Sequence, residues 1–164
     1  RVQKMTAVTF TVPGDPVPQP RPRVSTRGGF ARAFVPANHP VHAFRDRVAS
    51  AAQAAGLTEA ASPVSITIEA TFGRLRSHYR KAGVKPTAPP LRRPDCDNLA
   101  KAVLDGLQDV IGDDTRVARL TVEKAWGPAG STTVTIVAAE YGVELEGIGS
   151  RNEIAGWIIK EAIE

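Results

Sequence analysis

The stretch that organises the chain is Pro94-Asp95-Cys96-Asp97-Asn98-Leu99-Ala100-Lys101. Proline cannot continue a helix and biases the residue before it toward extended backbone, so an extended segment is expected to carry Asp95 and Asp97. Alternate residues of such a segment point to one side, about 7 Å apart. A helix should then begin near Asn98, with Asp97 or Asn98 as its N-cap. The stretch therefore predicts two carboxylates that face one point just before a helix.

These carboxylates have two open interpretations. Like charges aimed at one point repel each other, and a hard divalent cation such as Mg²⁺ relieves the repulsion because it takes oxygen ligands. Alternatively, Asp95 and Asp97 only cap the helix, where negative charge is favoured anyway. The surroundings favour the metal site, since Lys101 follows one turn later and a second acidic pair, Asp113-Asp114, precedes the next strand. Asp105, four residues after Lys101, is expected either to orient that lysine or to be solvated.

Two basic segments flank the acidic stretch. The first, from Pro16 to Phe44, holds four arginines and no acidic residue, with Gly28-Gly29 as an expected flexible tip. The second, residues 74–93, holds seven basic residues and no acidic one, and leads directly into Asp95. Long loops usually serve a function, and arginine suits bidentate contacts with phosphate. The residues expected to bind DNA are Arg21, Arg23, Arg27, Arg32, Arg74, Arg76, Arg80, Lys81, Lys85, Arg92 and Arg93.

The pattern of apolar residues predicts the fold class. Strands are expected over 5–12, 63–72, 116–126 and 132–139, with the last two joined as a hairpin through the turn at 127–130. Helices are expected over 40–56 and about 98–110, and the proline-rich segment 13–40 is expected to be a mostly irregular loop. The order β-α-β-α-β-β predicts a two-layer α+β fold with a mixed four-stranded sheet. Ser150-Arg151-Asn152-Glu153 has the form of a capping box and predicts an additional C-terminal helix.

The apolar stripes of the two central helices indicate which faces are buried. The stripe expected in the first helix is Val41, Phe44, Val48, Ala51 and Ala55, and that in the second is Leu99, Val103, Leu107 and Val110.

Charge and composition indicate the kind of partner. Residues 1–139 carry 19 Lys and Arg against 11 Asp and Glu, a net charge of +8, whereas residues 140–164 carry −4. A basic body with an acidic end suggests a polyanionic partner for the body. No apolar run reaches the length of a membrane span, and the first residues lack the apolar stretch of a signal peptide. The single cysteine, Cys96, excludes an internal disulfide and a cysteine-based zinc cluster and suits a reducing compartment, so a cytoplasmic protein is expected.

The combined pattern resembles the RusA family, the Holliday junction resolvases of bacteria and their phages. The resemblance rests on the stretch from Pro94 to Asp105, on Asp113-Asp114 before a Val-rich strand, and on Arg21-Pro22-Arg23 as a basic entry motif. It covers roughly residues 7–139 and implies an endonuclease domain over 5–140, with residues 141–164 as an acidic helical extension. It also implies a homodimer that cuts branched DNA, such as a four-way junction, with Mg²⁺ as cofactor and Mn²⁺ as an alternative ion.

The resemblance assigns roles to individual residues. Asp95, Asp97 and Asp114 are expected to bind the metal, and Asp113 is a weaker ligand candidate or a partner of the ligands. Lys101 is expected to neutralise the site and to stabilise charge in the transition state. Two alternatives remain open: a nuclease of broader branched or flap specificity with the same residues, and a non-catalytic junction-binding protein whose carboxylates only cap.

The position of Asp114 raises a geometric difficulty. A helix from Asn98 to Val110 would end about 18 Å from its start, and Asp114 follows only four residues later. Either the helix stops at Asp105-Gly106 and the chain folds back, or Asp114 approaches the carboxylates of the other subunit of a dimer. We favour the first arrangement, because a site within one chain needs no precise interface.

Overall fold

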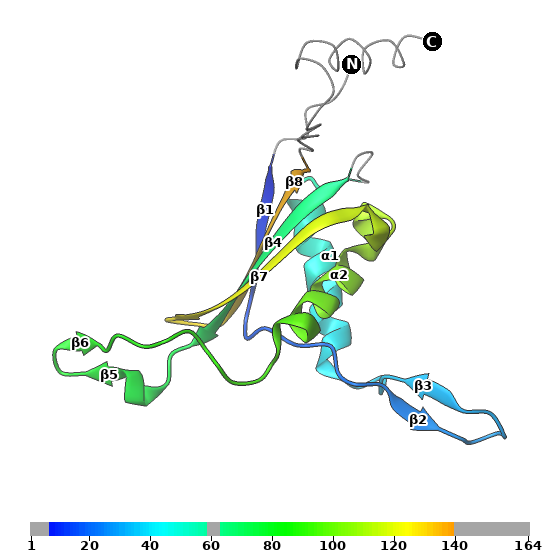
Figure 1. Cartoon of the computed structure of the whole chain (residues 1–164), viewed down its shortest axis with the longest axis horizontal. Coiled ribbons are helices and arrows are strands. Elements are labelled where there is room, and N and C mark those ends of the chain that lie inside the picture. Colours follow the sequence, from blue (N-terminus) through cyan, green and yellow to red (C-terminus); the bar gives the residue numbers. More distant parts are fainter. Residues whose placement is uncertain (1–6, 59–62, 140–164) are drawn as a thin grey trace, which may run out of the picture.

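The computed structural model describes residues 7–58 and 63–139, which form two layers (Figure 1). One layer is a mixed four-stranded sheet made of β1 (Val8–Pro13), β4 (Val64–Gly73), β7 (Val117–Gly127) and β8 (Ser131–Ala138). The other layer consists of helices α1 (Pro40–Ala54) and α2 (Cys96–Ile111), which lie side by side on one face of the sheet. The α+β class and the mixed sheet are thereby confirmed. The expected C-terminal helix falls outside the described residues.

The order of strands in the sheet is β1-β8-β4-β7, with β4 and β7 parallel and the other neighbours antiparallel. The prediction that the last two strands form a hairpin is therefore wrong, because β4 lies between them. The connection at 128–130 crosses the end of β4. Gly127 leaves room there for Thr71 of β4, whereas Gly130 leaves room for Asp15, which follows β1. A Cβ atom on Gly127 would lie 2.4 Å from the Thr71 side chain, and one on Gly130 would lie 2.7 Å from the Asp15 Cα.

The helices and one face of the sheet enclose the apolar core. All four residues expected on the stripe of α2 are buried. In α1 the expected residues Val41, Phe44 and Val48 are buried, whereas Ala55 is exposed at the helix C-cap. The opposite face of the sheet is polar, as the alternation predicts: the hydroxyl groups of Thr9 and Thr135 lie 3.0 Å apart across two neighbouring strands.

Helix α2 passes through Gly106 without a break. A Cβ atom at this position would lie 3.0 Å from both the Arg45 carbonyl oxygen and the Val48 Cβ of α1. Glycine is unfavourable inside a helix by about 1 kcal/mol, so its presence here is explained by the close approach of the two helices. The prediction that the helix stops at Asp105-Gly106 is therefore wrong.

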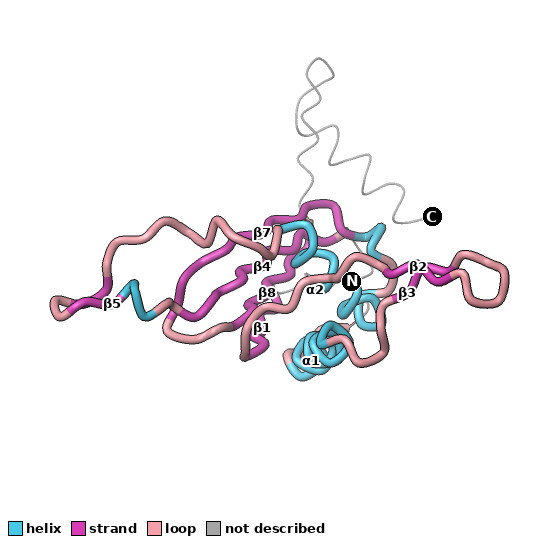
Figure 2. The backbone as a smooth tube through the Cα atoms, turned by 90° about the horizontal axis from the view of Figure 1, so that it is seen from below, coloured by secondary structure: helices cyan, strands magenta, loops and turns pink. Residues whose placement is uncertain are grey.

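Two arms extend from opposite sides of this body (Figures 1 and 2). The first arm, residues 20–36, contains the hairpin of β2 (Arg23–Ser25) and β3 (Arg32–Phe34). The second arm, residues 74–93, contains the 3-10 helix η1 (Arg76–His78) and the hairpin of β5 (Tyr79–Arg80) and β6 (Gly83–Val84). The first basic segment thus holds a short hairpin where a mostly irregular loop was expected, and the second basic segment also holds one.

Candidate active site

Asp95 is the N-cap residue of α2, which begins at Cys96 rather than near Asn98. Its backbone is extended, with φ −79° and ψ 152°, but Asp97 already lies in the first helical turn. The prediction that both carboxylates belong to one extended segment is therefore wrong. Positions two apart on a helix do not share a face, so the two side chains are not aligned by strand geometry. They remain neighbours at the positive end of the α2 dipole.

Asp95 occupies the N-cap position of α2 but makes no capping hydrogen bond, since its side chain accepts none from the backbone of the first turn. The Asp95 and Asp97 side chains are both exposed. A carboxylate that is exposed and not engaged as a cap is available to a cation from solvent, as the metal interpretation requires.

Lys101 and Asp105 belong to a polar network that joins the two helices. The Lys101 ammonium donates to the Asp105 carboxylate at 2.6 Å, which bears out the expected contact between them. The guanidinium of Arg45 on α1 donates to the same carboxylate and to the side chain of Gln19. The Gln19 backbone amide also donates to the Asn98 carbonyl at 2.8 Å, so the chain entering the first arm is attached to the start of α2.

Asp113 and Asp114 lie beyond the other end of α2. Asp113 is the N-cap of the 3-10 helix η2 (Asp114–Arg116) and accepts a hydrogen bond from the Thr115 backbone amide at 2.9 Å. Hydrogen bonds from that amide and from the Thr115 side chain lower the pKa of the Asp113 carboxyl. Asp114 is exposed and does not act as this cap. Of the pair, Asp114 is thus the better candidate for a ligand.

The length of α2 separates the two acidic groups. Fifteen steps from Cys96 to Ile111 correspond to about 22 Å along the helix axis. Figure 1 shows that α2 begins beside the lower end of the sheet and ends beside the start of β7, where η2 follows. Within residues 7–58 and 63–139, no three His, Cys, Asp or Glu side chains form a cluster that could hold a metal ion. A single chain therefore places Asp95 and Asp97 at the start of α2 and Asp114 beyond its end.

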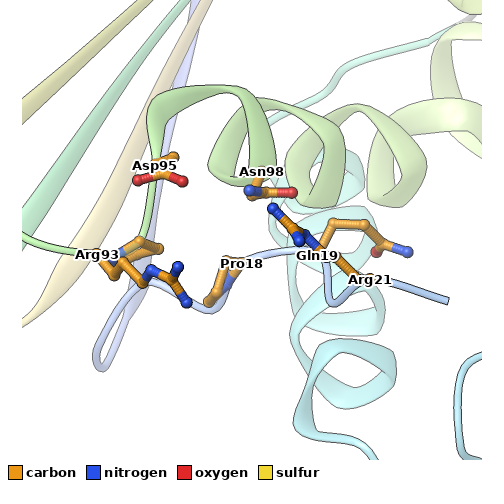
Figure 3. A pocket seen from close by; sticks show the side chains of 7 residues that line it. Pro18, Gln19, Arg21, Arg93, Asp95 and Asn98 are labelled. Atoms are coloured by element: carbon orange, nitrogen blue, oxygen red, sulfur yellow. The ribbon is translucent and has the colours of Figure 1, made fainter. Parts of the chain in front are cut away.

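An open pocket of about 380 Å³ adjoins Asp95 (Figure 3). Residues from the bases of both arms and from α2 line it: Pro18, Gln19, Arg21, Arg93, Pro94, Asp95 and Asn98. Arg21 and Arg93 bring positive charge from the two arms to the same place as the carboxylate. Pro18, Gln19 and Asn98 were not expected here, and no local signal in the sequence indicates that they meet.

The basic residues expected to bind DNA lie along both arms. Ten of the eleven are exposed, and Arg74 is half-buried. Three of them contact other residues of the chain. Arg74 donates to the Thr87 hydroxyl at 3.1 Å, and Lys85 donates to the Ser77 carbonyl at 2.7 Å. The Arg92 guanidinium lies 5.4 Å from the centre of the Trp126 ring. The arms therefore form two positively charged extensions on either side of the Asp95 pocket.

Comparison with known proteins identifies the family. The model of the family described as endodeoxyribonuclease RusA matches residues 13–137. The chain belongs to the RusA endodeoxyribonuclease family. A relative, the uncharacterized protein YqaN of Bacillus subtilis (strain 168), is 35% identical over 127 residues, which is 73% of this chain and 88% of the relative.

Membership of the RusA family confirms the resemblance seen in the sequence. The protein is a Holliday junction endodeoxyribonuclease, which hydrolyses phosphodiester bonds, and its substrate class is branched DNA. Nucleases of this family depend on a metal ion and are typical of bacteria and prophages. No helix in the described part of the chain is long and apolar enough to span a membrane.

Proposed function

We propose that this RusA-family protein cuts four-way DNA junctions as a homodimer, with two composite sites. Each site would combine Asp95 and Asp97 of one subunit with Asp114 of the partner subunit. The observation that carries this proposal is the unbroken helix α2, which keeps these carboxylates at opposite ends of one helix within each chain. In a two-fold dimer, a contact between the start of α2 in one subunit and the end of α2 in the other subunit occurs twice. One mode of docking would thus create two equivalent sites, as two symmetric cuts across a junction require.

The donor set suits Mg²⁺, with Mn²⁺ as an alternative ion. Carboxylate oxygens are the ligands that Mg²⁺ prefers, and Asp95 and Asp97 are exposed at the start of α2. Asp114 would add a third carboxylate, while Asp113, engaged with Thr115, would orient the loop that carries it. A bound divalent ion supplies an activated water and stabilises charge on the phosphate and on the leaving oxygen.

Lys101 would add a fixed positive charge beside the carboxylates. The Asp105 carboxylate accepts a hydrogen bond from its ammonium, and Arg45 in turn fixes Asp105. A lysine held in this way loses less freedom when it meets a phosphate group. We therefore assign Lys101 the stabilisation of negative charge that develops on the scissile phosphate.

The two arms would bring DNA to a site that would otherwise repel it. Carboxylates at Asp95 and Asp97 disfavour a polyanion, and arginines on both sides reverse the local field. Arg21 and Arg93 line the pocket beside Asp95 and would contact the phosphates nearest the scissile bond. Residues farther along the arms would contact the flanking duplexes. In this proposal residues 5–140 form the endonuclease domain, and residues 141–164 take no part in the chemistry.

The test is a cleavage assay on synthetic four-way, flap and linear duplex DNA, with and without Mg²⁺. Paired symmetric cuts in the four-way junction, only in the presence of the metal, are expected. Equal cleavage of the flap would indicate broader branched specificity. Tight junction binding without cleavage under any metal condition would contradict the nuclease function and leave a binding protein.

A further inference from the structure

Lys124 contacts the segment that immediately precedes Asp95 and Asp97, the carboxylates proposed to bind the metal. It lies on β7, one of the two edge strands of the sheet, opposite Ala70 of β4. Its ammonium donates to the backbone carbonyl of Arg92 at 2.9 Å and to that of Pro94 at 3.2 Å. Pro94 is the residue directly before Asp95, so this contact reaches the peptide unit from which the Asp95 carboxylate projects. These hydrogen bonds attach the chain between β6 and α2 to β7, and Figure 1 shows this chain running from the second arm past the sheet to α2.

Trp126, two residues farther along the same strand, contacts the same segment. Its indole N–H donates to the Ala88 carbonyl at 2.9 Å, and the Arg92 guanidinium lies over its ring. The His78 ring, on the other limb of the second arm, packs edge-on against the indole with ring centres 4.7 Å apart. Strand β7 therefore fixes the base of the second arm through Trp126, and fixes the entrance to α2 through Lys124.

The geometry of Lys124 argues against a role in binding phosphate directly. Two of the three N–H donors of its ammonium point at backbone carbonyls, and its side chain is half-buried. Hydrogen bonds from a charged donor are stronger than those between neutral groups, so this arrangement restrains the two carbonyls. Asp95 itself forms no capping hydrogen bond that would hold its side chain in place. The restraint on its backbone is then what limits where its carboxylate can go.

We propose that Lys124 is a positioning residue of the nuclease, which holds the turn at residues 92–94 so that Asp95 faces the metal and the scissile phosphate. This proposal rests on the proposed metal-binding role of Asp95. When DNA pulls on the arginines of the second arm, the attachment to β7 keeps that force from displacing Asp95. A displacement of about 1 Å at a reacting group can cost about 100-fold in rate.

The test compares Lys124→Met, which removes the donors, with Lys124→Arg, which retains a cation with several donors. Arg47→Met is the matched control, because Arg47 also donates to a backbone carbonyl, that of Pro13 at 2.8 Å, but far along the chain from Asp95. Four quantities are measured: kcat and KM on a four-way junction, junction affinity without metal, affinity for Mn²⁺ alone by electron paramagnetic resonance, and amide hydrogen exchange over residues 88–99.

Lys124→Met should lower kcat by about 10- to 100-fold, the usual effect of losing a group that orients a metal ligand. Junction affinity without metal should stay as in the unmodified protein, while Mn²⁺ binding weakens and exchange over residues 88–99 becomes faster. Lys124→Arg should keep most of the kcat of the unmodified protein. Arg47→Met should have the same kcat as the unmodified protein. If Lys124→Met does not fold, Lys124→Leu, which also lacks donors, replaces it with the same expected results.

An unchanged kcat with unchanged exchange over residues 88–99 would overturn the proposal. A loss of junction affinity as large as the loss of cleavage would also overturn it, since Lys124 would then serve DNA binding. If the unmodified protein does not cut junctions, the proposed function fails instead. The Mn²⁺ affinity and the exchange rates still decide whether Lys124 positions Asp95.

Discussion

Replacing Asp105 by Ala should destabilise the protein and also impair cleavage, because the Asp105 carboxylate accepts hydrogen bonds from side chains of both helices. It accepts hydrogen bonds from Lys101 on its own helix and from Arg45 on α1. The Asp105 side chain is 17% exposed and that of Arg45 is 24% exposed, whereas that of Lys101 is 56% exposed. Water therefore screens the contact with Lys101 much more than the contact with Arg45.

The expected magnitude follows from these exposures. An exposed pair four residues apart on a helix contributes about 0.3–0.5 kcal/mol, and a hydrogen bond to a charged group that is largely shielded contributes about 1.5–3 kcal/mol. The Arg45 Nε is already buried without a hydrogen-bond partner among the described residues. The hydrogen bonds of the guanidinium to Gln19 and Asp105 are therefore made by a terminal nitrogen. Asp105→Ala should then lower the free energy of unfolding by about 2–3 kcal/mol.

The assay is urea unfolding of Asp105→Ala, Arg45→Met and the double variant. The two single variants should each be destabilised, and their coupling energy should be at least about 1 kcal/mol because they share one interaction. Asp105→Asn, which keeps the shape of the side chain, serves to measure cleavage in a folded protein and should lower kcat more than junction affinity. A coupling energy near zero, or full cleavage by the folded Asn variant, would refute the reasoning.

Three further outcomes are expected. Asp97→Asn should abolish cleavage without weakening junction binding at fixed salt, because it removes a ligand charge and reduces repulsion of DNA; weaker binding would contradict its assignment as a ligand. Replacing Arg21 and Arg23 by Ala should lower the slope of log K against log salt by about 1 to 2, whereas an unchanged slope would mean that the first arm does not contact the DNA backbone. A protein ending near residue 141 should still cleave, and inactivity of a folded truncation would mean that the extension builds the site.

The local patterns of the sequence predicted the elements well. Alternation over 63–72 indicated a strand and the spacing of Leu99, Val103 and Leu107 indicated a helix, because burial on one face imposes these periods. The order of the strands was not predictable in the same way. Gly127 and Gly130 signal a turn whether it closes a hairpin or crosses the end of another strand, and only β4, far away in sequence, decides between the two.

The candidate site was predicted by residue type but not by geometry. Pro94 suggested an extended segment, whereas the helix begins two residues after it. Gly106 looked like a helix end, yet it provides room for the Arg45 backbone of α1. Lys124 contacts a segment 30 residues earlier in the chain, and such long-range contacts leave no periodic signal. The sequence thus predicts which carboxylates belong to the site, but it does not predict which of them lie close together in one chain.

The most direct test of the composite site is a heterodimer of an Asp97→Asn subunit and an Asp114→Asn subunit. If each site combines Asp95 and Asp97 of one subunit with Asp114 of the other, one site has lost both groups and the other is intact. The purified heterodimer should then nick one strand of a four-way junction, as should a control heterodimer of Asp97→Asn with the unmodified subunit. If the control nicks the junction but the mixed heterodimer leaves it uncut, all three carboxylates act within one chain and the account is contradicted.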